Sequence, residues 1–361
     1  MIQQMGKVTI RAVAEATGFS KTTVSFAFND PARISRETRE KILTTATEMG
    51  YVPNPGARNL SKGSYGTIGL LLPQVIPKAL ENPYLSLIIQ GIGQVCEQEG
   101  HTLTLIPPIK QSLLLGVQNA AVDGLITLGL EPEHEAVELI QRRSLPFVSI
   151  DGKAGNGFPV VGIRDRELAR EAMTLLTERG HRRIALISLV DAREMSVGSH
   201  VRSERLAGYR EVFEERFGPP REHPATGAPG LIELSCQTSL QGGREVADTL
   251  HTLETLPDAA AVMSDIVAIG MMERLAEIGI TVPDQFSLVG FDDIPESTIT
   301  RPRLTTISQP GRDKGRAAAE TLMKMIRGEA VHPEQVLHGR LLLRETVQPV
   351  PPVAPPQDHR T

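Results

Sequence analysis

The chain has 361 residues, of which 40% are hydrophobic and 22% are charged. This length is enough for two or three domains, and the composition is that of a globular protein, which excludes a disordered or fibrous chain. The two cysteines, Cys96 and Cys236, are too few for a disulfide scaffold or a zinc ribbon.

The sequence predicts a soluble, cytoplasmic protein. No stretch reaches the roughly 18 uninterrupted apolar residues that a membrane helix needs, and residues 1–15 lack the apolar run of a secretion signal. We expect no membrane partner, no metal site and no cofactor.

The formal net charge of -5 is distributed unevenly. Residues 1–65 contain nine Lys and Arg against five Asp and Glu, a net charge of +4, and the remaining residues therefore carry -9. A basic N-terminal segment on an acidic chain is typical of a protein that meets nucleic acid through that segment alone. An excess of basic residues this small also arises by chance. Charge alone does not distinguish chance from nucleic-acid binding.

Three short helices are predicted at the N-terminus, because apolar residues recur there at helical spacing after Ser or Thr residues that can cap a helix. The first helix is expected to end at Gly18. Two short helices joined by a turn that contains glycine make a helix-turn-helix motif, and we assign it to a DNA-binding domain over residues 1–52. The predicted caps are Thr9, Ser20 and Ser35, and the two later helices are expected over residues 21–28 and 37–49.

Residues 53–66 are rich in Pro, Gly, Asn and Ser and are interpreted as a hinge and linker. Pro55 followed by GARNL also permits a helix of one or two turns. Such a short helix is marginal in water, so we expect the segment to fold only when it docks, and to act as a switch.

From residue 67 to 346 apolar runs alternate with amphipathic stretches, which predicts βαβ units around buried parallel sheets. The fold class is therefore α/β, with helices flanking the sheets of two similar lobes. A small ligand is expected in the cleft between the lobes, at the carboxyl ends of the strands. The Pro-rich residues 347–361 are expected to form an unstructured tail.

The first series of strands is expected at 67–73, 101–106, 124–129 and 146–150; the second series begins near Val160 and has strands at 183–188, 231–236, 260–264 and 286–291. The helices are expected over 85–99, 111–121, 133–143, 167–178, 205–217, 242–253 and 266–277.

Ten motifs, in order over residues 8–346, resemble those of the LacI/GalR family of bacterial transcription repressors. They are TIRAVAEATGFSKTTVSFAFN, ISRETREKI, GYVPNPGARNL, TIGLLLP, ENPY, DGLI, RGHRRIALI, ERLAGY, SLVGFDDIP and PRLTTISQP. The resemblance implies a homodimeric regulator that binds an operator in double-stranded DNA through the helix-turn-helix head. It also implies a body like that of periplasmic sugar-binding proteins, in which a small effector sets operator affinity.

The second helix of a helix-turn-helix enters the major groove, so its early side chains Lys21 and Thr22 are candidates to contact base edges. Phe26 stands where many family members carry Arg or another polar group that reads a base. It can offer only an apolar face, for instance to a thymine methyl, or else it packs against the helices. By resemblance, phosphates would be held by Thr9, Ser20, Thr23, Ser25, Asn29 and Ser35, for each of which capping or turn formation is the alternative.

Leu60 matches the leucine that family members insert into the minor groove, where an apolar wedge kinks the duplex. Asn54 and Ala57 would lie beside it. Two such hinges meeting at the operator's centre imply a dimer and a near-palindromic site, and no C-terminal leucine-heptad helix points to a tetramer. The alternative is that Leu60 is only a linker residue.

Four polar residues match family positions that bind effector or line the cleft: Asp151, Arg205, Asp265 and Asp292. Carboxylates and an arginine suit the hydroxyls of a sugar or nucleoside, and Tyr84 is a candidate to stack on a ring. The alternatives are structural ion pairs or turn caps, and for Tyr84 a place in the core.

Several departures from the family leave the effector's identity open, as well as whether it induces or co-represses. Leu85 replaces a second aromatic, Ser264 replaces the usual Asn, and Arg164 with Asp165 replaces an Asp-Asn pair. Two loops that are longer than usual, at residues 74–81 and 190–203, are expected at the cleft mouth.

An enzyme on the same α/β layout is one alternative function, and a transport protein that binds solutes is another. The sequence has no GxxxxGK[ST], GxSxG or HExxH motif, and its nine histidines lack the spacing of metal ligands. Gly91 and Gly93 fall inside a predicted helix and are interpreted as helix packing. A transport protein would leave the basic head unexplained, so we expect a regulator without enzymatic activity.

Overall fold

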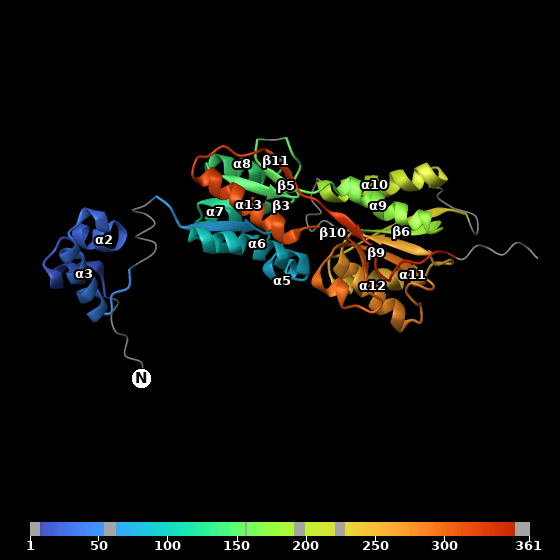
Figure 1. Cartoon of the computed structure of the whole chain (residues 1–361), viewed down its shortest axis with the longest axis horizontal. Coiled ribbons are helices and arrows are strands. Elements are labelled where there is room, and N and C mark those ends of the chain that lie inside the picture. Colours follow the sequence, from blue (N-terminus) through green and yellow to red (C-terminus); the bar gives the residue numbers. More distant parts are fainter. Residues whose placement is uncertain (1–7, 54–62, 156, 191–198, 221–227, 351–361) are drawn as a thin grey trace, which may run out of the picture. The chain divides into compact units, whose positions relative to one another are not determined.

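The computed structural model describes residues 8–53, 63–155, 157–190, 199–220 and 228–350. It divides after Gly66 into two compact units (Figure 1). We call the N-terminal unit the head and the unit that begins at Thr67 the body. No helix among these described residues is long and apolar enough to cross a bilayer.

The head consists of three short α-helices and one 3-10 turn. Their bounds are α1 Ile10–Thr17, α2 Lys21–Asn29, η1 Pro31–Arg33 and α3 Arg36–Glu48. Its core joins all three α-helices through small and branched side chains, namely Val13, Ala14, Val24, Ala27, Ile42 and Ala46.

All three predicted caps are confirmed. Thr9 Oγ1 accepts from the backbone N–H of Ala12 at 3.3 Å, and Ser20 Oγ accepts from that of Thr23 at 3.0 Å. Ser35 Oγ accepts from the N–H of Thr38 at 3.2 Å. Each bond satisfies a donor that the first turn of a helix leaves unpaired.

The predicted turn after the first helix is also confirmed. Gly18 ends α1 with φ +76°, in the left-handed region that glycine adopts at little cost. Gly18 and the cap Ser20 thus fix how α1 passes into α2.

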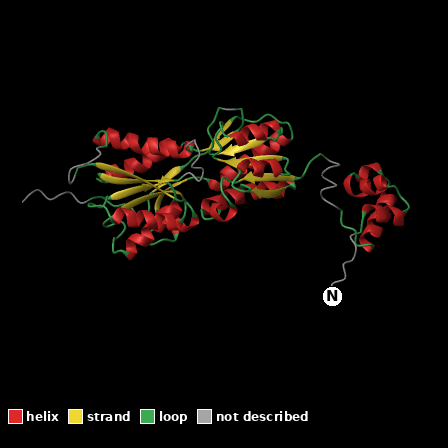
Figure 2. Ribbon diagram, turned by 180° about the vertical axis from the view of Figure 1, so that it is seen from behind, coloured by secondary structure: helices red, strands yellow, loops and turns green. Residues whose placement is uncertain are grey.

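The body contains two six-stranded sheets, each covered by helices on both faces (Figure 2). We call the first sheet with its helices lobe 1. Its strand order is β11-β5-β4-β3-β1-β2, with all neighbours parallel. The strands are β1 Thr67–Leu71, β2 Thr102–Ile106, β3 Gly124–Leu128, β4 Phe147–Ile150, β5 Val160–Gly162 and β11 Glu334–Val336. The helices are α5 Ile76–Ala79, α6 Pro83–Glu99, α7 Leu113–Asn119, α8 Glu135–Arg142 and α13 Gly311–Ile326.

Lobe 2 is built on the second sheet, in the order β12-β10-β9-β8-β6-β7, and only β12 is antiparallel to its neighbour. The strands are β6 Arg183–Leu189, β7 Gly230–Cys236, β8 Ala259–Val262, β9 Ser287–Asp292, β10 Thr305–Ser308 and β12 Arg340–Leu342. The helices are α9 Asp165–Glu178, α10 His200–Phe217, α11 Leu240–His251, α12 Asp265–Glu277 and the 3-10 turn η2 Pro295–Thr298.

The predicted alternation of strands and helices is confirmed, with one correction at Val160. That residue does not open the second series: it begins β5, which pairs with β4 in lobe 1. Lobe 2 begins instead with α9. The sequence analysis also did not predict α13, which returns from lobe 2 to pack on α6, or β11, which completes the first sheet. It likewise did not predict the short helix α5 or the strands β10 and β12.

Close approach of α6 and α13 explains one of the two glycines assigned to helix packing. A Cβ added at Gly91 would lie 2.0 Å from the carbonyl oxygen of Arg312, whereas one at Gly93 would meet nothing within 4 Å. Of these two glycines, only Gly91 lies where the helix backbones touch; Gly315 of α13 approaches the carbonyl oxygen of Ile88 in the same way, since a Cβ there would lie 2.1 Å from it.

The expected tail requires a correction at its start. Val347 is 7% exposed, and the backbone N–H of Val350 donates to the carbonyl of Arg179 at 2.8 Å. Residues 347–350 therefore pack on lobe 2. The rest of the predicted tail, residues 351–361, lies outside the described residues.

Candidate functional site

The α2 helix of the head exposes its first two side chains. Lys21 and Thr22 are exposed, whereas Val24 and Ala27 are buried in the head's core. The helix thus has one inner face and one polar outer face, as the base-reading role predicted for Lys21 and Thr22 requires.

The six residues predicted to hold phosphates have partners within the head. Thr9, Ser20 and Ser35 cap helices, Ser20 Oγ lies 2.9 Å from Thr23 Oγ1, and Asn29 Nδ2 donates to Ser25 Oγ at 3.1 Å. Both the capping role and a phosphate contact use the same exposed oxygens, so the phosphate contacts stay predictions.

Phe26 is half-buried, and its ring is covered by a cation. The guanidinium carbon of Arg33 lies 5.1 Å from the ring centroid. Sequence reasoning did not single out Arg33. The three predicted hinge contacts, Asn54, Ala57 and Leu60, lie outside the described residues.

In the body, Arg205 of α10 is 4% exposed and makes its hydrogen bonds to other residues of lobe 2. Its Nε donates to Asp165 Oδ1 at 2.7 Å and its Nη1 to the carbonyl of Met263 at 2.9 Å. Its guanidinium carbon lies 3.5 Å from the centroid of the Phe291 ring. Asp165, the first residue of α9, is the partner that sequence reasoning did not assign.

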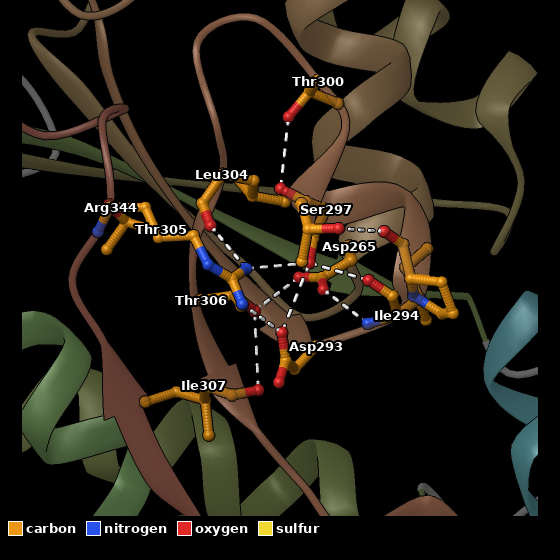
Figure 3. A network of polar contacts seen from close by, with 12 residues as sticks. Asp265, Asp293, Ile294, Ser297, Thr300, Leu304, Thr305, Thr306, Ile307 and Arg344 are labelled. Atoms are coloured by element: carbon orange, nitrogen blue, oxygen red, sulfur yellow. Dashed lines mark hydrogen bonds and ion pairs between the residues drawn. The ribbon is translucent and has the colours of Figure 1, made fainter.

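Asp265 closes the turn that follows β9 (Figure 3). Its side chain is fully buried, Oδ2 accepts from the N–H of Ile294 at 3.1 Å, and Oδ1 accepts from Thr306 Oγ1 at 2.5 Å. Burial and the nearby charge of Asp292 raise its pKa well above the usual value. These contacts favour the structural alternative for Asp265.

The same turn is held on its other side by an ion pair between Arg344 and Asp293. Arg344 Nη2 donates to Asp293 Oδ1 at 2.5 Å, and Arg344 Nη1 donates to Ser297 Oγ at 2.8 Å (Figure 3). Asp293 has φ +59°, a left-handed conformation that costs energy in a residue other than glycine. The Arg344 contacts fix this residue at the carboxyl end of β9.

Asp292, the last residue of β9, is 3% exposed. Its Oδ2 accepts from Ser264 Oγ at 2.9 Å and its Oδ1 from Gln309 Nε2 at 2.5 Å. Burial raises the pKa of Asp292 to about 6, against the opposing effect of the Arg205 charge.

From Asp292 a chain of hydrogen bonds continues into lobe 1. Gln309 Oε1 accepts from Lys314 Nζ at 2.7 Å, and Lys314 Nζ also donates to Asp151 Oδ1 at 2.6 Å. Lys314 lies in α13 and is fully buried, and Asp151 follows β4. Asp292 and Asp151, predicted independently, are therefore joined across the lobes by Gln309 and Lys314, which the sequence analysis missed.

Two cavities adjoin Asp151. One, of about 200 Å³, is lined by Tyr84, Asp151 and Gln74 of lobe 1 and by Leu189 and Thr238 of lobe 2. The Tyr84 hydroxyl is buried without a hydrogen-bond partner among the described residues, and burial raises its pKa well above the usual value.

The other cavity, of about 260 Å³, is lined among others by Asp151, Asp165, Arg164, His200 and Glu204. Gln74, from the first loop expected at the cleft mouth, and His200, from the end of the second, line these cavities. Residues 191–198 of the second loop lie outside the described residues. Arg205, Asp265 and Asp292 line neither cavity. Of the five predicted effector contacts, Tyr84 and Asp151 thus line a cavity, whereas Arg205, Asp265 and Asp292 do not.

Comparisons with known proteins agree with this division of the chain. Residues 9–54 match the family of bacterial regulatory proteins of the lacI type, and residues 173–347 match the periplasmic binding protein-like domain. The regulator IpsA of Corynebacterium glutamicum is 35% identical over 96% of this chain and 99% of its own. The repressor PurR of Vibrio parahaemolyticus is 30% identical over 94% of this chain and 98% of its own.

Among solved structures, the lac repressor dimer bound to operator and the anti-inducer ONPF has 25% sequence identity and a TM-score of 0.75. The match covers 95% of this chain and all of the repressor chain. The head, the two-lobed body and these matches together show that this chain belongs to the LacI family of DNA-binding transcriptional regulators.

Proposed function

We propose that this chain is a repressor that binds a near-palindromic operator as a homodimer, under the control of a small effector in the cleft between the lobes. The observation that carries the proposal is the exposed polar start of α2, at Lys21 and Thr22, on a head separate from a two-lobed body. The lac repressor in the similar structure is a dimer on operator DNA with a bound small molecule, which supports the same arrangement here. Operator binding implies a cytoplasmic location.

In this proposal α2 lies in the major groove, and Lys21 and Thr22 contact base edges. The hydroxyl and amide side chains around α2 hold phosphates and fix the register without reading sequence. They are Thr9, Ser20, Thr23, Ser25, Asn29 and Ser35. Leu60 enters the minor groove as the wedge, and Asn54 and Ala57 lie against the groove and backbone beside it.

The charges around the cleft favour a neutral, hydroxyl-rich effector. The two buried cations, Lys314 and Arg205, are each paired with a carboxylate, Asp151 and Asp165. The Lys and Arg side chains that line the two cavities also lie next to carboxylates, namely Arg164 with Glu167, Arg166 with Glu211 and Lys78 with Glu81. None of them is a free cation for an anionic ligand, whose burial would be costly. The unpartnered Tyr84 hydroxyl suits a ligand hydroxyl, so a sugar, a sugar derivative or a nucleoside fits the site.

The effector would act by linkage. A ligand that binds one arrangement of the lobes better than another shifts the population toward it, and so changes the free energy of docking both heads on DNA. Coupling of about 1–3 kcal/mol changes operator affinity roughly 5- to 150-fold. An inducer and a co-repressor differ only in the sign of this coupling.

The DNA-binding part is tested by footprinting purified full-length protein on genomic fragments. We expect protection of discrete, near-palindromic sites, and a greater loss of specific than of non-specific binding in Leu60→Ala. Equal losses for both kinds of DNA would reject the wedge, and the lack of any protected site would reject the function.

The effector part is tested by thermal shift, because the chain has no tryptophan to report binding. We expect stabilisation by neutral sugars, sugar alcohols or nucleosides rather than by their phosphates. Tyr84→Phe should weaken the response to such a ligand. The control Tyr209→Phe removes the hydroxyl of a buried tyrosine that lines neither cavity and should leave the response unchanged.

A further inference from the structure

The guanidinium of Arg33 is held against the outer face of α2 by two contacts. Its carbon lies 5.1 Å from the centroid of the Phe26 ring, and its Nε lies 2.8 Å from Asp30 Oδ2. The Arg33 side chain is nevertheless 65% exposed. A planar cation is thus stacked on a ring and tethered at one edge while its remaining surface faces solvent.

The backbone at Arg33 is fixed as well. Pro31 begins the 3-10 turn η1, where its ring restricts φ, and the N–H of Arg33 donates to the carbonyl of Asp30 at 3.1 Å. The next residue, Ile34, packs against the head's core. Both ends of the Arg33 side chain are therefore positioned before any partner arrives, which lowers the entropy lost on binding.

Arg33 extends a row of side chains that begins at Thr22. Residues four apart lie on one face of a helix, so Phe26 follows Thr22 on α2, and the Arg33 guanidinium lies over the Phe26 ring. The adjacent row on the same outer side contains Lys21 and Ser25. A surface that meets the major groove through Lys21 and Thr22 therefore also presents Arg33.

We propose that Arg33 reads the O6 and N7 edge of a guanine in the major groove, and that Phe26 is a positioning residue that holds it in place. This inference rests on the proposed function, in which α2 lies in that groove. Phenylalanine has no hydrogen-bonding group with which to read a base, whereas arginine donates two parallel hydrogen bonds to guanine. The ring beneath the guanidinium fixes the plane in which those donors lie.

The experiment first selects bound sequences from a random pool of duplex DNA with the full-length wild-type protein. Affinity is then measured for the selected site and for duplexes altered at each position, at one salt concentration, because phosphate contacts depend strongly on salt. The variants are Arg33→Ala, Arg33→Lys, Phe26→Leu and Phe26→Tyr. Arg11→Ala is the matched control, since Arg11 of α1 makes a similar exposed pair with Glu15 at 2.9 Å.

We expect Arg33→Ala to weaken binding to the selected site about 5- to 150-fold, the equivalent of one lost bidentate base contact. It should also abolish the preference for G·C at one position in each half-site. Arg33→Lys should not restore that preference, because an ammonium lacks the planar fork. Phe26→Leu should weaken the preference at the same position, and Phe26→Tyr, which keeps the ring, should retain it.

Three results would overturn the inference. One is an Arg33→Ala variant that keeps every base preference, as the Arg11→Ala control should, and loses affinity uniformly, as expected for a phosphate contact. Another is a Phe26→Leu variant that changes preference at a different position. The third is a folded Arg33→Ala variant, checked by circular dichroism, that binds like wild type. A wild-type protein that selects no sequence would instead reject the proposed function itself.

Discussion

The outer face of α2 and the cleft of the body hold their polar side chains in opposite ways. On α2, Lys21 and Thr22 are exposed and the ion pairs of the head lie at its surface. In the cleft, Lys314 and Asp165 are buried and each is paired with a charge from a distant part of the chain. The exposed face can change its side chains at little cost to folding, whereas each of these buried charges contributes to the stability of the fold.

The largest effect should come from separating the Lys314 pair. Lys314→Met leaves the carboxylate of Asp151, whose side chain is 16% exposed, without its cation, which should cost about 3 kcal/mol of unfolding free energy, at the lower end of the range for a broken buried pair. Urea unfolding followed by circular dichroism measures this loss. Lys324→Met, the same change at an exposed position of α13, should cost about 0.5 kcal/mol or less.

A second variant tests the cause of that loss. In Lys314→Met with Asp151→Asn both charges are removed, and most of the lost stability should return, because no buried charge is left without a partner. Asparagine is used because it tolerates the left-handed backbone of Asp151, with φ +57°, better than an apolar residue does. If the double variant is as unstable as Lys314→Met alone, the loss comes from packing rather than from the unpaired charge.

The next effect should appear as a dependence on pH at Asp292. Its pKa is raised to about 6 from a usual 3.8, so between these values the folded protein holds a proton that the unfolded chain has lost. The contribution of Asp292 to the free energy of unfolding should therefore fall as pH rises from about 4 to 6 and level off above, by up to about 3 kcal/mol.

Asp292→Asn is the comparison that isolates this effect. The variant cannot titrate at this position, so the difference in unfolding free energy between wild type and variant should shift against the wild type over the same pH range. A constant offset from altered hydrogen bonds to Ser264 and Gln309 would not change with pH. A difference that is flat between pH 4 and 6 would contradict the raised pKa.

The contrast between the two regions also explains what the sequence could predict. Local signals were sufficient in the head, where Thr9, Ser20 and Ser35 cap the helices that follow them directly. In the body, periodicity identified the alternating elements but not the sheet that each strand joins. Val160 follows β4 closely in sequence, and its place in lobe 1 depends on pairing rather than on its own residues.

The cleft shows the same limit at single residues. Asp151 was singled out because it matches a family position that binds effector or lines the cleft, but the resemblance did not identify its partner Lys314, which is 163 residues away. A lysine in a helix ordinarily indicates a solvated face. The available signal was its spacing, because Lys314 lies four residues before Ala318 and next to Gly315, on the buried face of α13. Only the contact with Asp151 explains why a charge is placed there.

A smaller effect is expected at the caps of the head. Ser20→Ala removes the oxygen that accepts from the N–H of Thr23, and should cost the head about 1 kcal/mol. Ser20→Gly should cost only a few tenths of a kcal/mol, since glycine is tolerated at an N-cap position. Thermal unfolding of the head measures both losses of stability. Equal losses in the two variants would mean that the hydroxyl contributes nothing as a cap.

The smallest effect should be found at the exposed pair of Arg36 with Glu40, whose side chains are 92% and 64% exposed and whose Nε and Oε1 lie 2.9 Å apart. A double-mutant cycle with alanine at both positions should give a coupling of about 0.5 kcal/mol or less, and it should vanish in high salt. The same cycle at Asp151 and Lys314 should give a coupling several times larger that salt hardly changes, because ions do not reach a fully buried ammonium. Couplings of equal size at the two pairs would remove the distinction between the exposed ion pairs of the head and the buried ion pairs of the body.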